Sequence, residues 1–529
     1  MAARGSSQTS GRGRARGIER RWWTLIAVCG ATFMLLVDIT IVQVALPTMQ
    51  RSLHASFSDL QWVISAYALS LASVILMQGA LADRFGRKRI FVVGLVVFTL
   101  ASLACGLAHT PAALIAARAV QGIGGAAMFA TSLALIGQEF QGSQRSTAIA
   151  AWGATVGGAV AVGPLVGGAL TSGLGWQWIF FVNVPVGLVT LVLARRMVNV
   201  GDPNATSLDW SGLFTFSGGL FLLVLGITRG NDDGWGSQTI MATLAAAGVL
   251  LLTFVIVELR HPRPMFDLSL FRKPAFTGVS IATFCVGGGM FAMLPYVTLY
   301  LQNDLGLSPL QGGIRLLPLT ALSFVVPIIS RPVTERVPAG LALGVGLATC
   351  GGGLMLFRGL TVHSGWTALL PGFVVAGVGI GLANPAIAKI ALGVVPPQRS
   401  GMASGISNTF RIGGVATGVA TIGAVFQHSL QTSLQPTVGD GAAELARQVA
   451  AGGVRALATG SGDHRALAAA AHHAFVSGMN ELFVVGAVAV FVGAVFAALV
   501  RRKDFYSRRR AGIRPTTAPP ERQLVSESL

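Results

Sequence analysis

The sequence predicts an all-α membrane protein that crosses a bilayer fourteen times. Its 529 residues are 53% hydrophobic and only 11% charged, whereas soluble domains carry about 25% charged residues. Apolar runs of about 20 residues, the length that a transmembrane helix needs, recur along the chain. They are continuous, unlike the alternating segments of a membrane β-barrel. These observations exclude a soluble globular domain and a disordered chain.

The fourteen runs fall into two groups of six with a central pair between them. Turns that contain charged residues, glycine or proline separate the runs. An even number of crossings places both termini on one side of the membrane. The predicted spans are residues 23–46, 60–80, 90–108, 112–135, 146–171, 178–195, 210–229, 239–258, 276–301, 312–330, 340–357, 367–392, 402–426 and 481–500.

This 6+2+6 plan predicts two six-helix bundles joined by two additional central helices. The longest connection is rich in alanine and glycine, and we expect it outside the cell. The predicted parts are a basic disordered tail (1–21), the N-terminal bundle (22–200), two linking transmembrane helices (201–262), the C-terminal bundle (263–501) with an external loop (427–480), and a second basic tail (502–529).

The net charge of +18 is explained by membrane orientation and requires no nucleic acid. With both termini in the cytoplasm, most of the 38 Lys and Arg residues fall in cytoplasmic loops and tails. Such a bias fixes the orientation of membrane proteins. We therefore expect N-in, C-in topology, with the basic tails close to anionic lipid headgroups.

The remaining reactive side chains predict neither an enzyme nor a resident metal. The four cysteines lie inside apolar runs without CxxC spacing. His464, His472 and His473 in the external loop could bind a metal, but a solvated helix face is the favoured interpretation. The sequence contains no GxxxxGK[ST] loop, so ATP is not the expected energy source.

A short cytoplasmic turn between the second and third spans combines glycines with charge. Gly79 is expected to let two helices approach closely, and Gly86 to permit a tight turn. Asp83 beside Arg84 and Arg87 is suited to a charge latch that holds one arrangement of the bundles and releases another. The alternative interpretation is an ordinary cluster of orienting charges.

An acid and an arginine stand inside otherwise apolar spans. Asp38 lies within the first span and Arg118 within the fourth. A carboxylate there costs about 2.5–3.5 kcal/mol on insertion scales, and such groups are functional by default. We expect Asp38 to bind and release protons, with Arg118 as a fixed positive charge beside it. The alternative is a structural hydrogen bond between helices.

Several motifs resemble those of the major facilitator superfamily. The segment 79–89 resembles its best-known signature, and 36–47 resembles the first-helix motif of its fourteen-helix drug:proton antiporters. The segment 176–187 is also typical of that family. The fourth span matches the motif around a membrane-embedded arginine at Leu114, Arg118, Gln121, Gly122, Gly124 and Gly125, and the fifth matches the antiporter helix motif at Gly158, Gly163, Pro164, Gly167 and Gly168.

The resemblance covers nearly the whole chain and implies a fold, an activity and an energy source. It implies the major facilitator fold and export of hydrophobic or amphipathic drugs by alternating access. The energy source would be the proton gradient, with no cofactor. The implied setting is the bacterial cell membrane, and the expected partners are a small-molecule substrate, protons and the bilayer.

Residues near mid-span are nominated for a substrate cavity, since soft and aromatic groups suit amphipathic ligands. Lys389 and Arg315 near helix ends are interpreted as snorkelling side chains. Pro164 and Asn384-Pro385 are expected to kink their helices. The nominated cavity residues are Phe33, Met34, Tyr67, Met128, Trp152, Phe291, Met293, Tyr296 and Arg411.

Two alternatives to broad drug efflux stay open at this point. One is a dedicated exporter of a single endogenous metabolite, such as a self-made antibiotic, a siderophore or an amino acid. The other is a membrane sensor or assembly partner that uses the same fold without transport. We expect a monomer, and a periplasmic or outer-membrane partner stays open.

Overall fold

The computed structural model is a helical bundle in every part that it describes. The described residues are 20–140, 142–197, 210–260, 268–334, 336–395, 400–450, 463–501 and 504–505. Among them, each of the fourteen predicted segments is helical and no strand occurs. The predicted tails, 1–21 and 502–529, lie almost entirely outside the described residues.

The first bundle is made by the helices that precede residue 195. Short caps fix several of their starts: Ser56 and Asp59 form a reciprocal capping box before α2, and Thr110 caps α4. The helices are α1 (Arg20–Leu53), α2 (Phe57–Phe85), α3 (Arg87–Gly106), α4 (Pro111–Glu139), α5 (Gly142–Gly173), α6 (Trp178–Phe181) and α7 (Asn183–Ala194).

The second bundle follows the linking pair α8 (Trp210–Asp233) and α9 (Gln238–Arg260). It consists of η1 (Leu268–Arg272), α10 (Pro274–Gly289), η2 (Phe291–Met293), α11 (Leu294–Leu299), η3 (Tyr300–Asp304), α12 (Pro309–Thr334), α13 (Ala339–Leu356), η4 (Trp366–Leu369), α14 (Leu370–Gly393), α15 (Ser400–Val438), η6 (Gly439–Gly441), α16 (Ala442–Ala450), α18 (Asp463–Phe496) and η7 (Ala497–Leu499).

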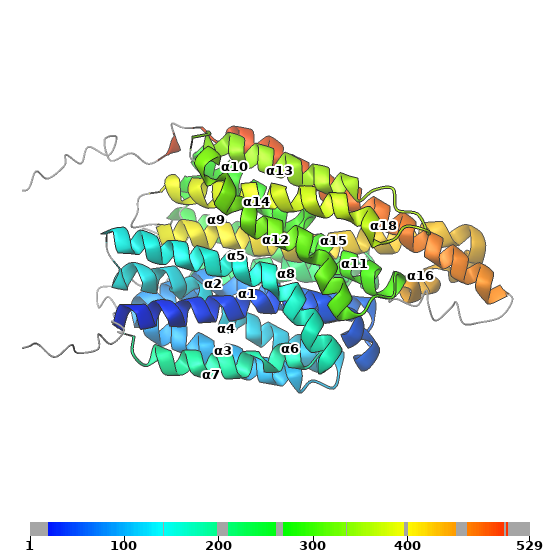
Figure 1. Ribbon diagram of the computed structural model, residues 1–529, viewed down its shortest axis with the longest axis horizontal. Helices are drawn as coiled ribbons and strands as arrows, with labels where there is room; N and C mark the ends of the chain where they lie inside the picture. The colour runs from blue at the N-terminus through cyan, green and yellow to red at the C-terminus, as the bar shows by residue number, and fades with distance from the viewer. Residues whose placement is uncertain are drawn as a thin grey trace, which may run out of the picture.

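The two bundles lie side by side, with α5 packed against α12 and α2 packed against α15 (Figure 1). In this view α1 begins and α18 ends at the left, which we call the inner end. The opposite, outer end carries α16. The sequence predicts that the inner end faces the cytoplasm.

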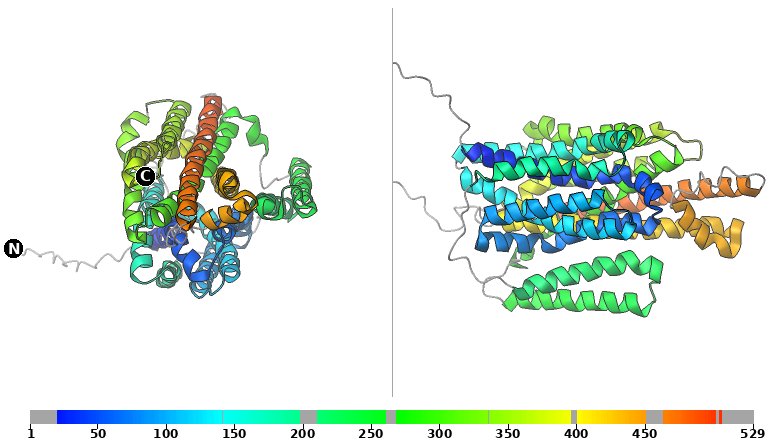
Figure 2. Two further views of the ribbon diagram at one scale, coloured as in Figure 1. Left: turned by 90° about the vertical axis from the view of Figure 1, so that its right-hand side faces the viewer. Right: turned by 90° about the horizontal axis from the view of Figure 1, so that it is seen from below.

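The linking helices form a separate hairpin on the side of the molecule (Figure 2). α8 packs against both α2 and α15, so it touches one helix of each bundle. Ser217 of α8 donates a hydrogen bond to the carbonyl oxygen of Ser73 in α2, at 2.5 Å. Leu220 and Val224 of α8 pack beside Ala416 of α15.

Two predicted boundaries are corrected by the structure. The span at 276–301 is broken, because α10 ends after three glycines and Pro295 follows at the start of α11. The loop expected over 427–480 is mostly helical where it is described: α15 runs to Val438, α16 packs against it, and α18 begins at Asp463. Its alanine-rich sequence favours helix over loop.

Twelve of the described helices are long and apolar enough to cross a membrane. A thirteenth span is α5, which bends by 43° between Ala151–Ala159 and Val162–Gly173. Trp178–Ala194 is a shorter apolar helix. The bend lies beside Pro164, as the sequence predicts, because proline removes a helical hydrogen bond.

Glycines of α5 allow the closest helix approaches in this region. A side chain at Gly163 would collide with Thr40 of α1, and one at Gly167 would collide with Ile41. At Gly168 it would meet the backbone of Pro309 and Leu310 in α12. The predicted close packing is therefore confirmed at these three glycines.

We expect Gly168→Val to lower the free energy of unfolding by about 1–3 kcal/mol, because the added atoms overpack the α5–α12 contact. Gly158→Val is the matched control, since a Cβ at Gly158 would meet no atom within 4 Å. Thermal unfolding of the purified protein in detergent measures both. Equal destabilisation by the two variants would contradict this interpretation.

Candidate functional site

A buried ion pair joins α1 to α4 inside the first bundle. The guanidinium of Arg118 donates a hydrogen bond to Oδ2 of Asp38 at 2.5 Å. The two side chains are 2% and 0% exposed. The sequence placed both residues inside spans, and the structure brings them into direct contact.

The other oxygen of Asp38 is held by two amide groups. Gln121 Nε2 donates to Asp38 Oδ1 at 2.9 Å, and Asn183 Nδ2 donates at 3.2 Å. Both amides also donate to the hydroxyl of Ser102, which in turn donates to the carbonyl oxygen of Phe180 at 3.0 Å. The hydrogen bonds around this one carboxylate therefore connect α1, α3, α4, α6 and α7.

Arg118 has partners beyond Asp38. Its Nε donates to the carbonyl oxygen of Val63 in α2 at 3.2 Å, and NH1 donates to Gln121 Oε1 at 2.7 Å. The guanidinium lies 4.1 Å from the ring centroid of Tyr67, within the range of a cation–π contact. Multiple partners are what a buried charge pair needs to offset its desolvation.

The sequence predicts part of this network. Asp38, Arg118, Gln121 and Asn183 all stand in the family-like motifs, and the sequence assigns a role to Asp38 and Arg118. It does not predict that Ser102 or Asn183 contacts Asp38, although each is a polar residue within an apolar run. Their polarity was the available signal, but only the rotation of α3 and α7 shows that they face Asp38.

The predicted gating turn is partly described. Gly86 ends α2 and starts α3 with φ of 102°, which confirms the tight turn. Arg87 NH1 donates to the carbonyl oxygen of Ala134 at 3.4 Å, while Arg84 is exposed. The side chain of Asp83 lies outside the described residues, so its predicted role as a latch stays a prediction.

The close approach predicted at Gly79 is wrong for this conformation. A Cβ there would meet no atom within 4 Å, and the same holds for Gly158 in the antiporter helix motif. A glycine permits a close approach only where another helix lies against it, and at both positions no neighbouring atom lies within that distance. The tight glycine contacts of α5 are to α1 and α12, at residues nearer the outer end.

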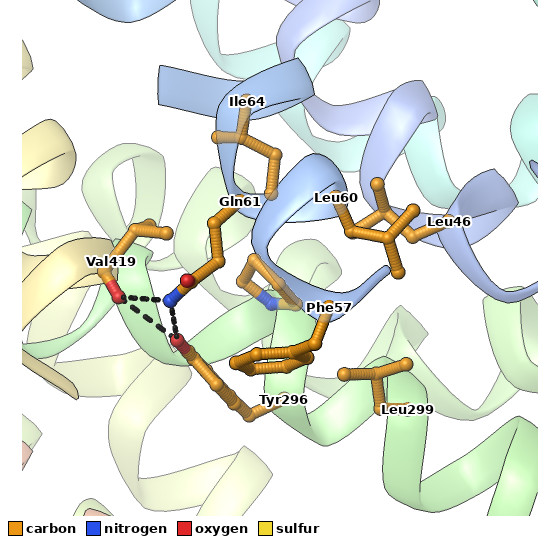
Figure 3. A pocket seen from close by; sticks show the side chains of 9 residues that line it. Leu46, Phe57, Leu60, Gln61, Ile64, Tyr296, Leu299 and Val419 are labelled. Atoms are coloured by element: carbon orange, nitrogen blue, oxygen red, sulfur yellow. Dashed lines mark hydrogen bonds between the residues drawn. The ribbon is translucent and has the colours of Figure 1, made fainter. Parts of the chain in front are cut away.

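Contacts between the two bundles are tight in the outer half. Gln61 donates to the hydroxyl of Tyr296 and to the carbonyl oxygen of Val419, each at 3.2 Å, and Tyr296 donates to the same carbonyl at 2.9 Å (Figure 3). Gln302 Nε2 donates to the carbonyl oxygen of Val44 at 2.7 Å. These bonds link α1 and α2 to α11, η3 and α15.

The same closure extends along α5. The amide of Leu310 donates to Ser172 Oγ at 3.1 Å, and a side chain at Gly157 would meet Phe324 of α12. These contacts between the bundles therefore run along α5 from Ser172 to Gly157.

The nominated cavity residues are not gathered at one place. Met34, Tyr67 and Met128 are buried in the core of the first bundle, whereas Phe33 is 38% exposed. Trp152 donates its indole hydrogen to Thr32 Oγ1 at 3.0 Å. Phe291 and Met293 form η2, Tyr296 belongs to the outer contact, and Arg411 is half-buried on α15.

Residues at the helix ends have local partners. Lys389 Nζ reaches the carbonyl oxygen of Thr334 at 3.4 Å, and Arg315 lies over the ring of Trp366 at 5.2 Å. His472 Nε2 lies 3.0 Å from Asp304 Oδ1 and its side chain is 32% exposed, and His473 is exposed. The side chain of His464 lies outside the described residues.

Two helical bundles in contact, with a buried acid–arginine pair in one of them, are the architecture of a membrane transporter. The chain belongs to the Major Facilitator Superfamily, whose family model matches residues 28–419.

Bacterial relatives support this assignment. The chain is 34% identical over 416 residues to the tetracenomycin C resistance and export protein of Streptomyces glaucescens, covering 78% of this chain and 77% of that protein. It is 36% identical over 416 residues to the multidrug resistance protein Stp of Mycobacterium tuberculosis, with the same coverage. It is 34% identical over 448 residues to the probable actinorhodin transporter of Streptomyces coelicolor, covering 82% and 77%.

A solved structure supports the fold. The inward-facing, unoccupied structure of a bacterial homolog of the human lysosomal transporter Spinster matches with a TM-score of 0.61. It covers 93% of this chain and all of that chain at 19% identity. The likeness confirms the major facilitator fold predicted from the motifs.

We expect Arg118→Gln to lower the free energy of unfolding by about 3–5 kcal/mol, because it leaves the Asp38 carboxylate buried without its counter-charge. Adding Asp38→Asn should restore part of that loss, since the second change removes the orphaned charge. Arg447→Gln, which removes an exposed charge in α16, is the control. Denaturant unfolding in mixed micelles measures all of them, and no recovery in the double variant would contradict the pairing energetics.

Proposed function

We propose that this protein exports hydrophobic or amphipathic drugs or antibiotics across the bacterial cytoplasmic membrane in exchange for protons. The observation that carries the proposal is the Asp38–Arg118 network, because it holds one ionisable group at the meeting point of several helices. The names of the bacterial relatives, which describe resistance and export, support the direction and the class of substrate.

Asp38 has the properties of a proton carrier. As a carboxylate it accepts hydrogen bonds from Arg118, Gln121 and Asn183. Protonation removes the charge that these donors bind, while Arg118 stays cationic. The helices that meet at Asp38 would then be held differently in the two states. This difference is what couples proton binding to movement.

The closed outer half supports alternating access. The positive-inside bias orients both termini toward the cytoplasm, so the described conformation is closed toward the outside. Opening requires the inter-bundle bonds to break, which are those that Gln61 donates to Tyr296 and Val419 and the one that Gln302 donates to Val44. In this scheme Asp83, Arg84 and Arg87 gate the inner end, and the proton gradient supplies the energy without a cofactor.

A dedicated exporter of one endogenous metabolite is the second candidate. Two of the relatives are named for a single compound, tetracenomycin C and actinorhodin. The same proton chemistry serves either function. The breadth of a panel of exported compounds distinguishes them.

We expect Asp38→Asn to abolish proton-dependent efflux of a fluorescent dye panel from expressing cells, because asparagine cannot exchange a proton. Glu444→Gln, an exposed acid in α16, is the matched control and should export normally. A protonophore should stop export by the unmodified protein. Export that survives the protonophore would reject proton coupling, and normal export by a folded Asp38→Asn would reject the assignment of Asp38.

A cross-link across the closed outer half tests alternating access. The backbone amide of Leu310 lies 3.1 Å from Ser172 Oγ, so cysteines at both positions should form a disulfide on oxidation. We expect that disulfide to stop transport and a reductant to restore it. The single-cysteine variants are the controls. Undiminished transport by the oxidised double variant would contradict the need for this contact to open.

A further inference from the structure

Arg411 is a charge inside a span without a described partner. It lies in α15, a helix long and apolar enough to cross the membrane. Its Nε is buried and has no hydrogen-bond partner, and no ion pair joins its side chain to any acid in the described part of the chain. Arg118, the other deep arginine, has an acid, an amide, a carbonyl and a ring as partners. Arg411 thus has hydrogen-bond donors that no described residue uses.

Arg411 lies beside the contact between the two bundles. The next residue, Ile412, packs against the cluster that Ala416 of α15 forms with Ala68 and Leu69 of α2. Farther along α15, the carbonyl oxygen of Val419 accepts from Gln61 of the first bundle and from Tyr296 of the second. Two turns, or about 12 Å, separate Arg411 from that contact toward the inner end.

The backbone that carries Arg411 is held firmly. A side chain at Gly287 of α10 would collide with the carbonyl oxygen of Arg411, and one at Gly414 would collide with that of Phe284. Gly418 lies equally close to Gly288. The α10–α15 contact is therefore backbone to backbone. It fixes the position of the helix that carries the half-buried Arg411 side chain.

We infer that Arg411 binds an acidic group of the transported compound, such as a carboxylate, on the inner side of the closed outer contact. A guanidinium offers five donors in a planar fork that matches a carboxylate. Arg118 is unsuited to the same task, because its guanidinium already donates to Asp38, Gln121 and Val63 within the first bundle. The inference rests on the proposed export function. It adds that amphipathic acids are among the compounds that the protein exports.

The first test compares two ligands and needs no variant. The purified full-length protein in uncharged detergent is titrated with 1-pyrenebutyrate and with its methyl ester, and fluorescence anisotropy reports binding. We expect the acid to bind at least tenfold more tightly than the ester. Equal binding of the two, or no binding of the acid, would overturn the inference.

The second test uses three variants in the same assay. Arg411→Gln should remove the preference for the acid and leave ester binding unchanged. Arg411→Lys should keep part of the preference for the acid. Arg315→Gln should keep all of that preference, since Arg315 lies over the ring of Trp366. A preserved preference in Arg411→Gln would overturn the inference; if that variant fails to fold, the ligand pair and Arg411→Lys decide. Because binding needs no proton gradient, a failure here is distinct from a failure of proton coupling.

Discussion

The first bundle depends on hydrogen bonds that stabilise one buried carboxylate, that of Asp38, in the place of water. Asp38 and Arg118 are almost completely buried, and each would be strongly unfavourable alone. The network around them replaces water with an amide from α4, an amide from α7 and, through Ser102, the chain at α6. Since the donors come from several helices, the position of those helices and the charge on Asp38 are physically tied together. Any change in that charge is felt across the bundle.

The second bundle holds its deep arginine differently. Glycines of α10 and α15 bring the two helices together without side chains between them, and Arg411 on α15 has no described partner. The first bundle therefore contains a charged pair that is hydrogen-bonded on all sides, whereas the second contains an arginine without a described partner. If the first responds to protons and the second to an acid on the cargo, the two ligands never compete for the same atoms. Their coupling must pass through the contact between the bundles.

Much of this architecture follows from the sequence, and the exceptions have a common cause. The length of each apolar run fixes its role as a helix, and the glycines at 163, 167 and 168 predict close packing that the structure confirms. Asp38 and Arg118 stand out because charge is rare in such runs. Ser102, Asn183 and the open position of Gly79 could not be predicted, since they depend on how each helix is rotated and on which conformation the bundles adopt. The break after α10 and the helix α16 were missed because a hydropathy pattern measures burial in lipid, not local backbone geometry.

The hairpin of α8 and α9 has a consequence for compounds dissolved in the bilayer. α8 is bonded to α2 through Ser217 and lies against Ala416 of α15 through Leu220 and Val224. It therefore covers the line where these two helices of opposite bundles meet. Lipid tails, and any drug partitioned among them, are kept from that line by a layer of protein. On this side of the transporter, α8 therefore blocks entry from the membrane interior between α2 and α15.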